Sequence, residues 1–398
     1  MPSTVMTRKP LFILLPVLLA LNICSADEGF WVAGTQGIYR GTIDAKTGKL
    51  GDVTLISTAK GPNFLALSPD HSYLYATLAQ SVEAFELKAH NALNPLNERP
   101  TGGAGACHVS LDATGHDLFA ANYDGGSIAC LKIKDDGSLG EQTALIPFTG
   151  TGPDPKRQTK PYAHSIYADP DNKFVYACDL GTDSIWIFQF DADKGTLTPA
   201  TPPVAKAPPG SGPRHLAFSP NGKYVFSSNE MGHSVTSFSR NAATGELTTI
   251  GTVSSLTPDV PDEGVTTAEI ACHPSGKWVY VSNRGCDTIS VLAVGDDGKL
   301  TFVQEISAGV KFPRSFALDA NGNWLVAAGQ KSNEIDVLQI DPATGKLSPT
   351  YQTAPVPGAI CVLFPGKLAD STPAHTQDSH SSDSHPPTDT HTPDKDVQ

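Results

Sequence analysis

Three residues that could bind an anion and transfer protons lie at the ends of one short segment. The segment from Gly212 to Glu230 reads GPRHLAFSPNGKYVFSSNE, with Arg214 and His215 near its start and Glu230 at its end. Apolar residues alternate on both sides of a Pro-Asn-Gly turn, which predicts a β-hairpin. Because a hairpin brings its two ends to one edge of a sheet, we expect a guanidinium, an imidazole and a carboxylate to meet there.

Related hairpins carry polar residues at the same two positions elsewhere in the chain. Counting about seven or eight residues outward from each turn places these side chains at one mouth of a shared channel. The opposite mouth receives only Asn, Gly, Ser, Asp and Lys turns. Any one such residue is more often structural, and an Asn at a strand exit usually bonds its own loop, but the group favours a small-molecule site. The group comprises His108, His164, Arg214, His215, Glu230, Glu269, Arg284 and Arg314, with Asn122 and Asp179 at strand exits.

The hairpins belong to a longer repeat. Similar units begin near residues 63, 107, 163, 214, 269 and 314, and each has a third strand and, after a turn such as Thr-Gly-Lys-Leu, a fourth. Four antiparallel strands every ~45–55 residues are typical of a β-propeller blade. Residues 30–57 supply a second, third and fourth strand, and Gly358 to Phe364 supply a first. Joining these ends covers two sheet edges and predicts an all-β, seven-bladed β-propeller of four-stranded antiparallel blades.

The composition agrees with a β-rich globular protein and excludes some partners. The 398 residues include 36 Gly and 32 Pro, and only 17% are charged, which suits many short strands joined by tight turns. The formal net charge is −13 and there is no polybasic run, so we expect no nucleic-acid partner. A bound anion would need a pocket that collects a few cations locally.

The first 26 residues read as a signal peptide. Arg8 and Lys9 precede an apolar run from Leu11 to Ile23, and Cys24-Ser25-Ala26 follows. The run is short for a membrane span, and nothing later resembles one. We expect export to the periplasm or the medium. A lipoprotein signal is the weaker alternative, because bulky Ile23 precedes Cys24.

The segment 367–398 differs in composition from the propeller expected over residues 27–366. Ser, Thr, Pro, Asp and His dominate it, so it buries too little apolar surface to fold and reads as a disordered tail. Its four histidines could loosely chelate a metal, but their spacing fixes no geometry, and a solvated tether is the favoured interpretation. They are His375, His380, His385 and His391.

The cysteines indicate no metal or redox motif. Six follow the leader without CxxC spacing, and most lie in apolar strand patterns where Cys behaves as a small buried hydrophobe. Buried free thiols are favoured, and disulfides stay open for an exported protein. We expect no metal, no cofactor and a monomer.

Several segments resemble the seven-bladed lactonase family, which includes propeller-type 6-phosphogluconolactonases and carboxy-cis,cis-muconate cyclases. They are the opening segment, AHSIYADPDNKFVYACDLGTDSI, AANYDGGSI and AEIACHPSGKWVYVSNRGCDTISV. The resemblance extends over nearly all of the chain between leader and tail. It implies that His164 of AHS, Arg214 of PRH, Glu230 of SNE and Arg284 of SNRG correspond to the family's proposed active-site set.

The chain departs from the family pattern at four places. The family usually has HAHS at Tyr162 to Ser165, Asn-Gln at Gly329-Gln330, an Arg at Asp183-Ser184, and GTYT at Gly34 to Gly37. These differences leave it open whether the chain holds a substrate phosphate. The leader is also unexpected for a cytoplasmic sugar-phosphate substrate.

These residues together predict hydrolysis of a sugar-acid lactone without a metal. Arg214 and Arg284 would hold a carboxylate or phosphate and stabilise an oxyanion. Glu230 or His164 would activate water, and the other would protonate the leaving alkoxide. No GxSxG, HExxH or P-loop pattern competes for the chemistry. Two alternatives stay open: a non-catalytic extracytoplasmic binding or scaffold module, and a muconate-type cycloisomerase that binds a dicarboxylate.

Overall fold

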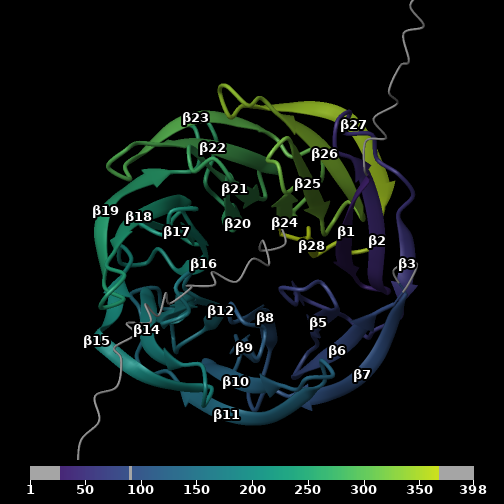
Figure 1. The fold of residues 1–398 in the computed structure, drawn as a ribbon. Helices are drawn as coiled ribbons and strands as arrows, with labels where there is room; N and C mark the ends of the chain where they lie inside the picture. The colour runs from purple at the N-terminus through teal and green to yellow at the C-terminus, as the bar shows by residue number, and fades with distance from the viewer. Residues whose placement is uncertain (1–26, 89–91, 367–398) are drawn as a thin grey trace, which may run out of the picture. The chain divides into compact units, whose positions relative to one another are not determined.

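The computed structural model of the protein describes residues 27–88 and 92–366. These residues form seven four-stranded antiparallel sheets that surround a common axis as the blades of a propeller (Figure 1). The first strand of each blade lies nearest the axis, and the fourth lies on the outer rim. The predicted all-β, seven-bladed propeller is therefore confirmed.

Each blade consists of four neighbouring strands, which are named from the axis outward. Blade 1 contains β28 (Cys361–Leu363), β1 (Asp27–Gly34), β2 (Gly37–Asp44) and β3 (Thr54–Ser57). Blade 2 contains β4 (Leu65–Leu67), β5 (Tyr73–Thr77), β6 (Ser81–Leu87) and β7 (Leu93–Pro100). Blade 3 contains β8 (Ala106–Leu111), β9 (Asp117–Asn122), β10 (Ser127–Ile133) and β11 (Leu139–Pro147). Blade 4 contains β12 (Ala163–Ala168), β13 (Phe174–Asp179), β14 (Ser184–Asp191) and β15 (Thr196–Lys206), with the 3₁₀ helix η2 (Leu180–Thr182) after β13. Blade 5 contains β16 (Pro213–Phe218), β17 (Tyr224–Asn229), β18 (Ser234–Arg240) and β19 (Leu247–Ser254). Blade 6 contains β20 (Thr266–Cys272), β21 (Trp278–Arg284), β22 (Thr288–Val294) and β23 (Leu300–Ser307). Blade 7 contains β24 (Pro313–Leu318), β25 (Trp324–Gly329), β26 (Glu334–Ile340) and β27 (Leu347–Pro355).

The turn of the inner hairpin forms for a local reason that the repeat preserves. In blade 5 the Ser219 hydroxyl accepts a hydrogen bond from the backbone N–H of Tyr224, and Gly222 adopts a φ of 66°, which favours glycine. In blades 3, 4 and 7 a carboxylate replaces the hydroxyl and accepts two backbone N–H groups. These carboxylates belong to Asp112, Asp169 and Asp319.

A register shift interrupts the inner hairpin of blades 3 to 7 close to the start of its first strand. In blade 5 Pro213 pairs with Asn229 and His215 with Ser228, so Arg214 is the extra residue of a β-bulge. The shift falls at the corresponding place in the other four blades. A bulge breaks the alternation of side chains between the two faces and re-aims the extra side chain. The bulges therefore decide where the polar residues at this mouth point.

Apolar packing between adjacent blades, together with one recurring hydrogen bond, holds the ring together. The hydroxyl of Tyr75 donates to the carbonyl of Gly137 in the next blade at 3.0 Å. Tyr176 and Tyr280 make the same contact with Gly245 and Gly345, both at 2.8 Å. Each ring is buried while its hydroxyl keeps a partner, as a buried tyrosine requires.

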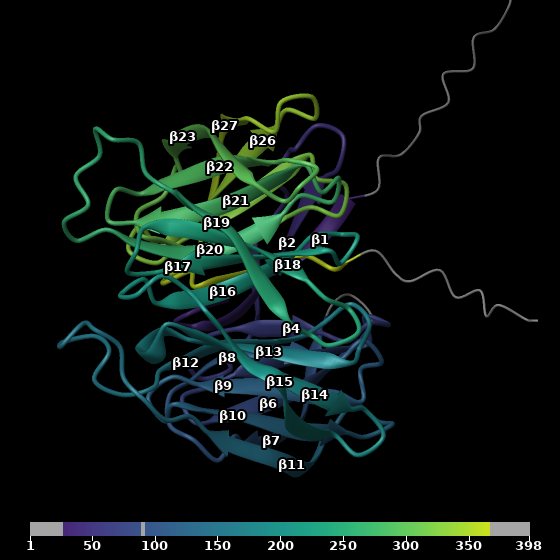
Figure 2. The same cartoon turned by 90° about the vertical axis from the view of Figure 1, so that its left-hand side faces the viewer.

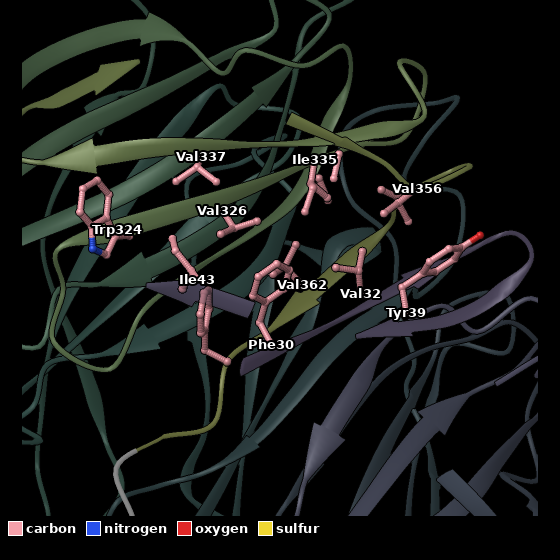
Figure 3. Packing of buried hydrophobic residues seen from close by; sticks show 14 residues of the cluster. Phe30, Val32, Tyr39, Ile43, Trp324, Val326, Ile335, Val337, Val356 and Val362 are labelled. Carbon is pink, nitrogen blue, oxygen red and sulfur yellow. The ribbon is translucent and has the colours of Figure 1, made fainter. Parts of the chain in front are cut away.

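The C-terminal strand β28 closes the ring by joining the N-terminal blade. It pairs with β1 in antiparallel register, with Cys361 opposite Ala33 and Leu363 opposite Trp31. Figure 3 shows Val362 of this strand beside Phe30 and Val32, in a buried cluster that also contains residues of β25 and β26. Closure by chain ends that are far apart in sequence was predicted and is confirmed.

Two long connections project from the same face of the propeller, on the left of Figure 2. One joins β11 to β12 through residues 148–162, and the other joins β19 to β20 through residues 255–265. The first of them carries Arg157, which contacts Glu230 at the end of β17. This face is the mouth that the sequence predicted to hold the ionisable residues.

Two predicted segments flank the part of the chain that the structure describes. The predicted signal peptide at 1–26 and the predicted tail at 367–398 lie outside the described residues, so both stay predictions. Within the described ranges no helix is long and apolar enough to cross a membrane. The six cysteines of the described part are all free, and four of them are buried.

Candidate functional site

A cavity of about 520 Å³ opens at this mouth of the propeller. Its walls come from blades 2 to 7, and its volume lies in the range of small-molecule sites, ~300–1,000 Å³. The lining residues with chemically active or aromatic side chains are Cys107, Tyr123, Arg157, His164, Glu230, Arg284 and Arg314, with Asp124 at the edge.

The β-bulges supply several of these side chains. Cys107, His164 and Arg314 are each the extra residue of a bulge at the start of an inner strand, and all three line the cavity. Arg214 is the extra residue in blade 5 and reaches the carboxylate of Glu230. Because the bulge re-aims its extra residue, one repeated backbone irregularity gathers an imidazole, a thiol and two guanidinium groups.

Glu230 is the centre of a cluster of cations. Its carboxylate lies 2.7 Å from Nη2 of Arg157, 3.0 Å from Nη2 of Arg284 and 3.2 Å from Nε of Arg214. Burial raises the pKa of Glu230, but the charges of Arg284, Arg214 and Arg157 outweigh burial and hold the pKa at about 2. The group is therefore a carboxylate at neutral pH and a weak base.

His164 lines the cavity beside this carboxylate as an uncharged imidazole. Its Nε2 lies 4.0 Å from Oε2 of Glu230, and its ring packs against Tyr123 and His215. Burial, followed by the charge of Arg214, lowers the pKa of His164 well below 6.5. Its Nδ1 is buried without a hydrogen-bond partner in the described structure. The imidazole is therefore uncharged at neutral pH and keeps a nitrogen lone pair for a proton, although its lowered pKa makes it a weaker base than a free histidine.

Two further arginines differ in how they are held. Arg284 contacts Glu230, donates to the carbonyl of Thr267 at 3.4 Å and lies over the ring of Phe312, while burial lowers its pKa to about 10. Arg314 is half-buried and lines the cavity, yet its side chain makes no hydrogen bond or ion pair with any other described residue. Arg314 is therefore a guanidinium that is free to bind a ligand.

The charges in the cavity do not cancel. The guanidinium groups of Arg157, Arg214, Arg284 and Arg314 converge there, against the carboxylates of Glu230 and Asp124. This local excess of positive charge sits in a chain whose formal net charge is −13. Buried charge without a partner is unfavourable, so the cavity is suited to an anion or to developing negative charge.

Comparison with known protein families identifies a match over nearly the whole propeller. The model of the family described as "Lactonase, 7-bladed beta-propeller" matches residues 24–364.

The chain belongs to the seven-bladed lactonase family.

Individual relatives cover most of this lactonase-family chain. A protein of Bacillus subtilis named 6-phosphogluconolactonase is 32% identical over 83% of this chain and 95% of its own length. A protein of the same name from Cronobacter sakazakii is 30% identical over 79% of this chain and 92% of its own. A crystal structure of a protein from Lactobacillus plantarum superposes with a TM-score of 0.79 at 31% identity, over 85% of this chain and 99% of that one.

The four residues that the family resemblance implied lie in one cluster of this lactonase-family propeller. Arg214, Arg284 and His164 all lie within 4.0 Å of the Glu230 carboxylate. They come from the three consecutive blades 4, 5 and 6, so the packing of adjacent blades brings them together. Their roles in a reaction stay predictions, whereas their proximity is a structural fact.

Three other predicted site residues form a layer beneath the cavity and do not line it. His215 Nδ1 lies 2.7 Å from Oε1 of Glu269 and 3.3 Å from Nη1 of Arg214, and the His108 ring packs against His215 and Phe64. Burial lowers the pKa of both histidines well below 6.5 and raises the pKa of Glu269. His215 contacts Arg214 directly, while Glu269 and His108 contact His215, which suits this layer to hold the arginine in position.

Asn122 and Asp179 bind their own loops. Asn122 is fully buried and bonds to the hydroxyls of Thr101 and Ser127. Asp179 accepts from the N–H groups of Tyr162 and Gly181 and from the Thr182 hydroxyl, which caps η2. Neither side chain is among the residues that line the cavity, and their contact with substrate stays a prediction.

Sequence reasoning missed Arg157, which lies outside the repeated hairpins. The neighbouring residue Gln158 is fully buried and donates to the Asp183 carboxylate at 2.7 Å and to the Leu180 carbonyl at 2.8 Å. These bonds anchor the 148–162 connection and direct Arg157 to Glu230. The length of the 148–162 connection was the feature of the sequence that could have indicated a functional residue there, because long ordered loops often carry function.

No group of three or more His, Cys, Asp or Glu side chains in residues 27–88 and 92–366 is arranged to hold a metal ion. The thiol of Cys107 lines the cavity, but burial raises its pKa to about 12. It is therefore a protonated, weakly reactive group at neutral pH.

Proposed function

We propose that this lactonase-family propeller hydrolyses the lactone of a sugar acid. The observation that carries the proposal is the pairing of an uncharged His164 with a guanidinium cluster in one 520 Å³ cavity. Lactone hydrolysis needs a base for water and positive charge for the oxyanion, and these groups supply both. Relatives named 6-phosphogluconolactonase at 30–32% identity support the reaction class.

The geometry favours His164 over Glu230 as the base. The pKa of Glu230, about 2, makes its carboxylate a poor proton acceptor, and three arginines already occupy it. His164 would accept a proton from water as the water oxygen attacks the lactone carbonyl carbon. The imidazolium would then return this proton to the ring oxygen when the carbon–oxygen bond breaks, which yields a hydroxy acid.

Arg284 and Arg314 would stabilise the oxyanion of the tetrahedral intermediate. Arg284 is held in place by Glu230 and by the Thr267 carbonyl, which provides the preorganisation that this form of catalysis needs. Arg314 has no competing partner among the described residues. Removal of one such donor commonly lowers kcat by about 10²–10³.

A panel of lactones tests the proposal. Purified full-length protein is incubated with glucono-δ-lactone, 6-phosphoglucono-δ-lactone and a muconate-derived lactone, and acid release is followed by pH-stat titration. We expect turnover of a sugar-acid lactone that falls at least 100-fold in His164→Ala and in Arg284→Met. Exposed His116 and rim residue Arg99 provide matched controls, and neither His116→Ala nor Arg99→Met should alter turnover.

Two outcomes would contradict lactone hydrolysis and favour one of the alternative functions. Ligand binding without turnover of any lactone favours a binding module, and isomerisation of the muconate lactone favours a cycloisomerase. Export is proposed separately from the leader sequence, and detection of a shortened mature protein outside the cytoplasm tests it.

A further inference from the structure

A second hollow of about 440 Å³ adjoins the cavity at the same mouth. Its walls come from blades 7, 1, 2 and 3, and its lining includes Thr35, Lys60, Asn63 and Gln330. We call the cavity the first compartment and this hollow the second compartment. Asn63, Ala79 and Ala106 line both, so the two compartments are neighbours that share one wall.

Mostly small side chains form the shared wall. Two of its three residues are alanines, and glycines at 34, 61 and 358 line the second compartment further out. A ligand in the first compartment can therefore extend over Ala79 and Ala106 without meeting a bulky group. A single sugar lactone would occupy only one of the two compartments.

The amide side chains of the second compartment lack partners. Asn63 and Gln330 are half-buried, yet neither side chain hydrogen-bonds to another residue that the structure describes. By contrast, the half-buried amides of Gln304 and Gln352 each donate to a backbone carbonyl, at 3.1 and 2.9 Å. Asn63 and Gln330 line the second compartment with amides that no other described side chain or backbone group occupies, so both are available to bond a ligand.

The chemistry of the second compartment suits hydroxyl groups. Each amide offers two N–H donors and a carbonyl acceptor, which matches a hydroxyl that both donates and accepts. The lining residues include no carboxylate, and the one charged residue is the exposed Lys60. An uncharged, polyhydroxylated ring therefore fits this compartment.

We infer that the substrate is the lactone of a two-ring sugar acid, with its lactone ring in the first compartment and its second sugar ring in the second. The inference rests on the proposed lactone hydrolysis and adds the class of substrate. The lactone ring would face His164 and Arg284, while Asn63 and Gln330 bind hydroxyls of the second ring. Only the lactone carbon–oxygen bond is cleaved, so the glycosidic bond remains intact.

Competing lactones of different size test this inference. The kcat/KM of the full-length protein is measured for maltobiono-δ-lactone, glucono-δ-lactone and 6-phosphoglucono-δ-lactone. We expect the two-ring lactone to exceed glucono-δ-lactone at least tenfold. A two-ring to one-ring ratio near one, or preference for the phosphorylated single ring, would overturn the inference while leaving lactone hydrolysis intact.

Two substitutions test whether the preference for a two-ring lactone depends on the second compartment. Gln330→Leu removes hydrogen bonds from the second compartment, and Ala79→Trp fills the shared wall, so each should lower the two-ring to one-ring ratio at least fivefold. Gln189→Leu, on the exposed side of β14, is the matched control and should leave the ratio unchanged. An unchanged ratio in both test variants contradicts the assignment.

A binding measurement separates failure of the inference from failure of the proposed reaction. If no lactone is hydrolysed, titration calorimetry with maltobionate and gluconate still reports on the second compartment. At least tenfold tighter binding of maltobionate, weakened by Gln330→Leu, supports the compartment and rejects the reaction. Equal binding of the two acids rejects the compartment.

Discussion

Replacement of Glu230 by Gln should destabilise the protein by about 3 kcal/mol at pH 7. Glu230 is 5% exposed, and its pKa falls from 4.5 to about 2 because three guanidinium groups surround it. At about 1.4 kcal/mol for each pKa unit, that fall corresponds to about 3 kcal/mol of folding free energy. The glutamine keeps the shape of the side chain but leaves the cations without their carboxylate.

The pH dependence of the same variant tests the same lowered pKa in a second way. A carboxyl whose folded pKa is depressed stabilises the protein above its unfolded pKa and loses this effect as pH falls toward its folded pKa. The difference between wild type and Glu230→Gln should therefore be constant above about pH 5. Below pH 4.5 it should shrink by about 1.4 kcal/mol for each pH unit and approach zero near pH 2.

Equilibrium urea denaturation measures both quantities, provided that unfolding is reversible. Exposed Glu141 supplies the matched control, and Glu141→Gln should change the unfolding free energy by less than about 0.5 kcal/mol. The double variant Glu230→Gln/Arg284→Met should cost less than the two single substitutions combined, because it leaves fewer unpaired cations. A Glu230→Gln protein as stable as wild type would refute the account of the cluster.

Three further outcomes concern buried groups of the propeller other than Glu230. Burial lowers the pKa of His108 well below 6.5, so the folded protein loses stability as pH drops below 6.5. In His108→Phe, the free energy of unfolding should therefore fall less steeply between pH 6 and 5, by about 1.4 kcal/mol for each pH unit. Urea titration at several pH values measures this slope. Cys107, whose pKa is about 12, should resist iodoacetamide at pH 8 in the folded protein and react after denaturation, as mass spectrometry would show. Val362→Ala removes two methyl groups from the buried closure cluster and should cost about 2 kcal/mol in urea denaturation, and a loss below about 0.5 kcal/mol would contradict tight packing there.

The fold could be predicted from the sequence because the blade is a repeat with local signals. The Pro-Asn-Gly turn at Asn221-Gly222 and the alternation on either side specify one hairpin without reference to distant contacts. The unmatched strands at the two chain ends then leave ring closure as the solution that covers both edges. The register of β28 against β1 bears this out.

The sequence could not show in the same way which predicted side chains line the cavity and which lie buried beneath it. Alternation alone places Arg214 and His215 on opposite faces, but the bulge at Arg214 changes the register, and no residue type in the segment marks it. As a result, counting residues outward from each turn placed His164 and His108 in one group, although His164 lines the cavity and His108 lies in the layer beneath it. Arg157 was missed because its position depends on Gln158 bonding to another blade.

The order of the strands in blade 1 has a consequence for biosynthesis. Because β28 ends at Leu363, the ring stays an open arc until that residue has left the ribosome. At ~5–20 residues per second, translation of that length lasts roughly 20–70 s, during which β1 has an unoccupied edge. A neighbouring nascent chain could donate its own last strand to that edge and link two arcs. Expression on crowded polysomes should therefore enrich strand-exchanged dimers, and slower initiation should favour single rings.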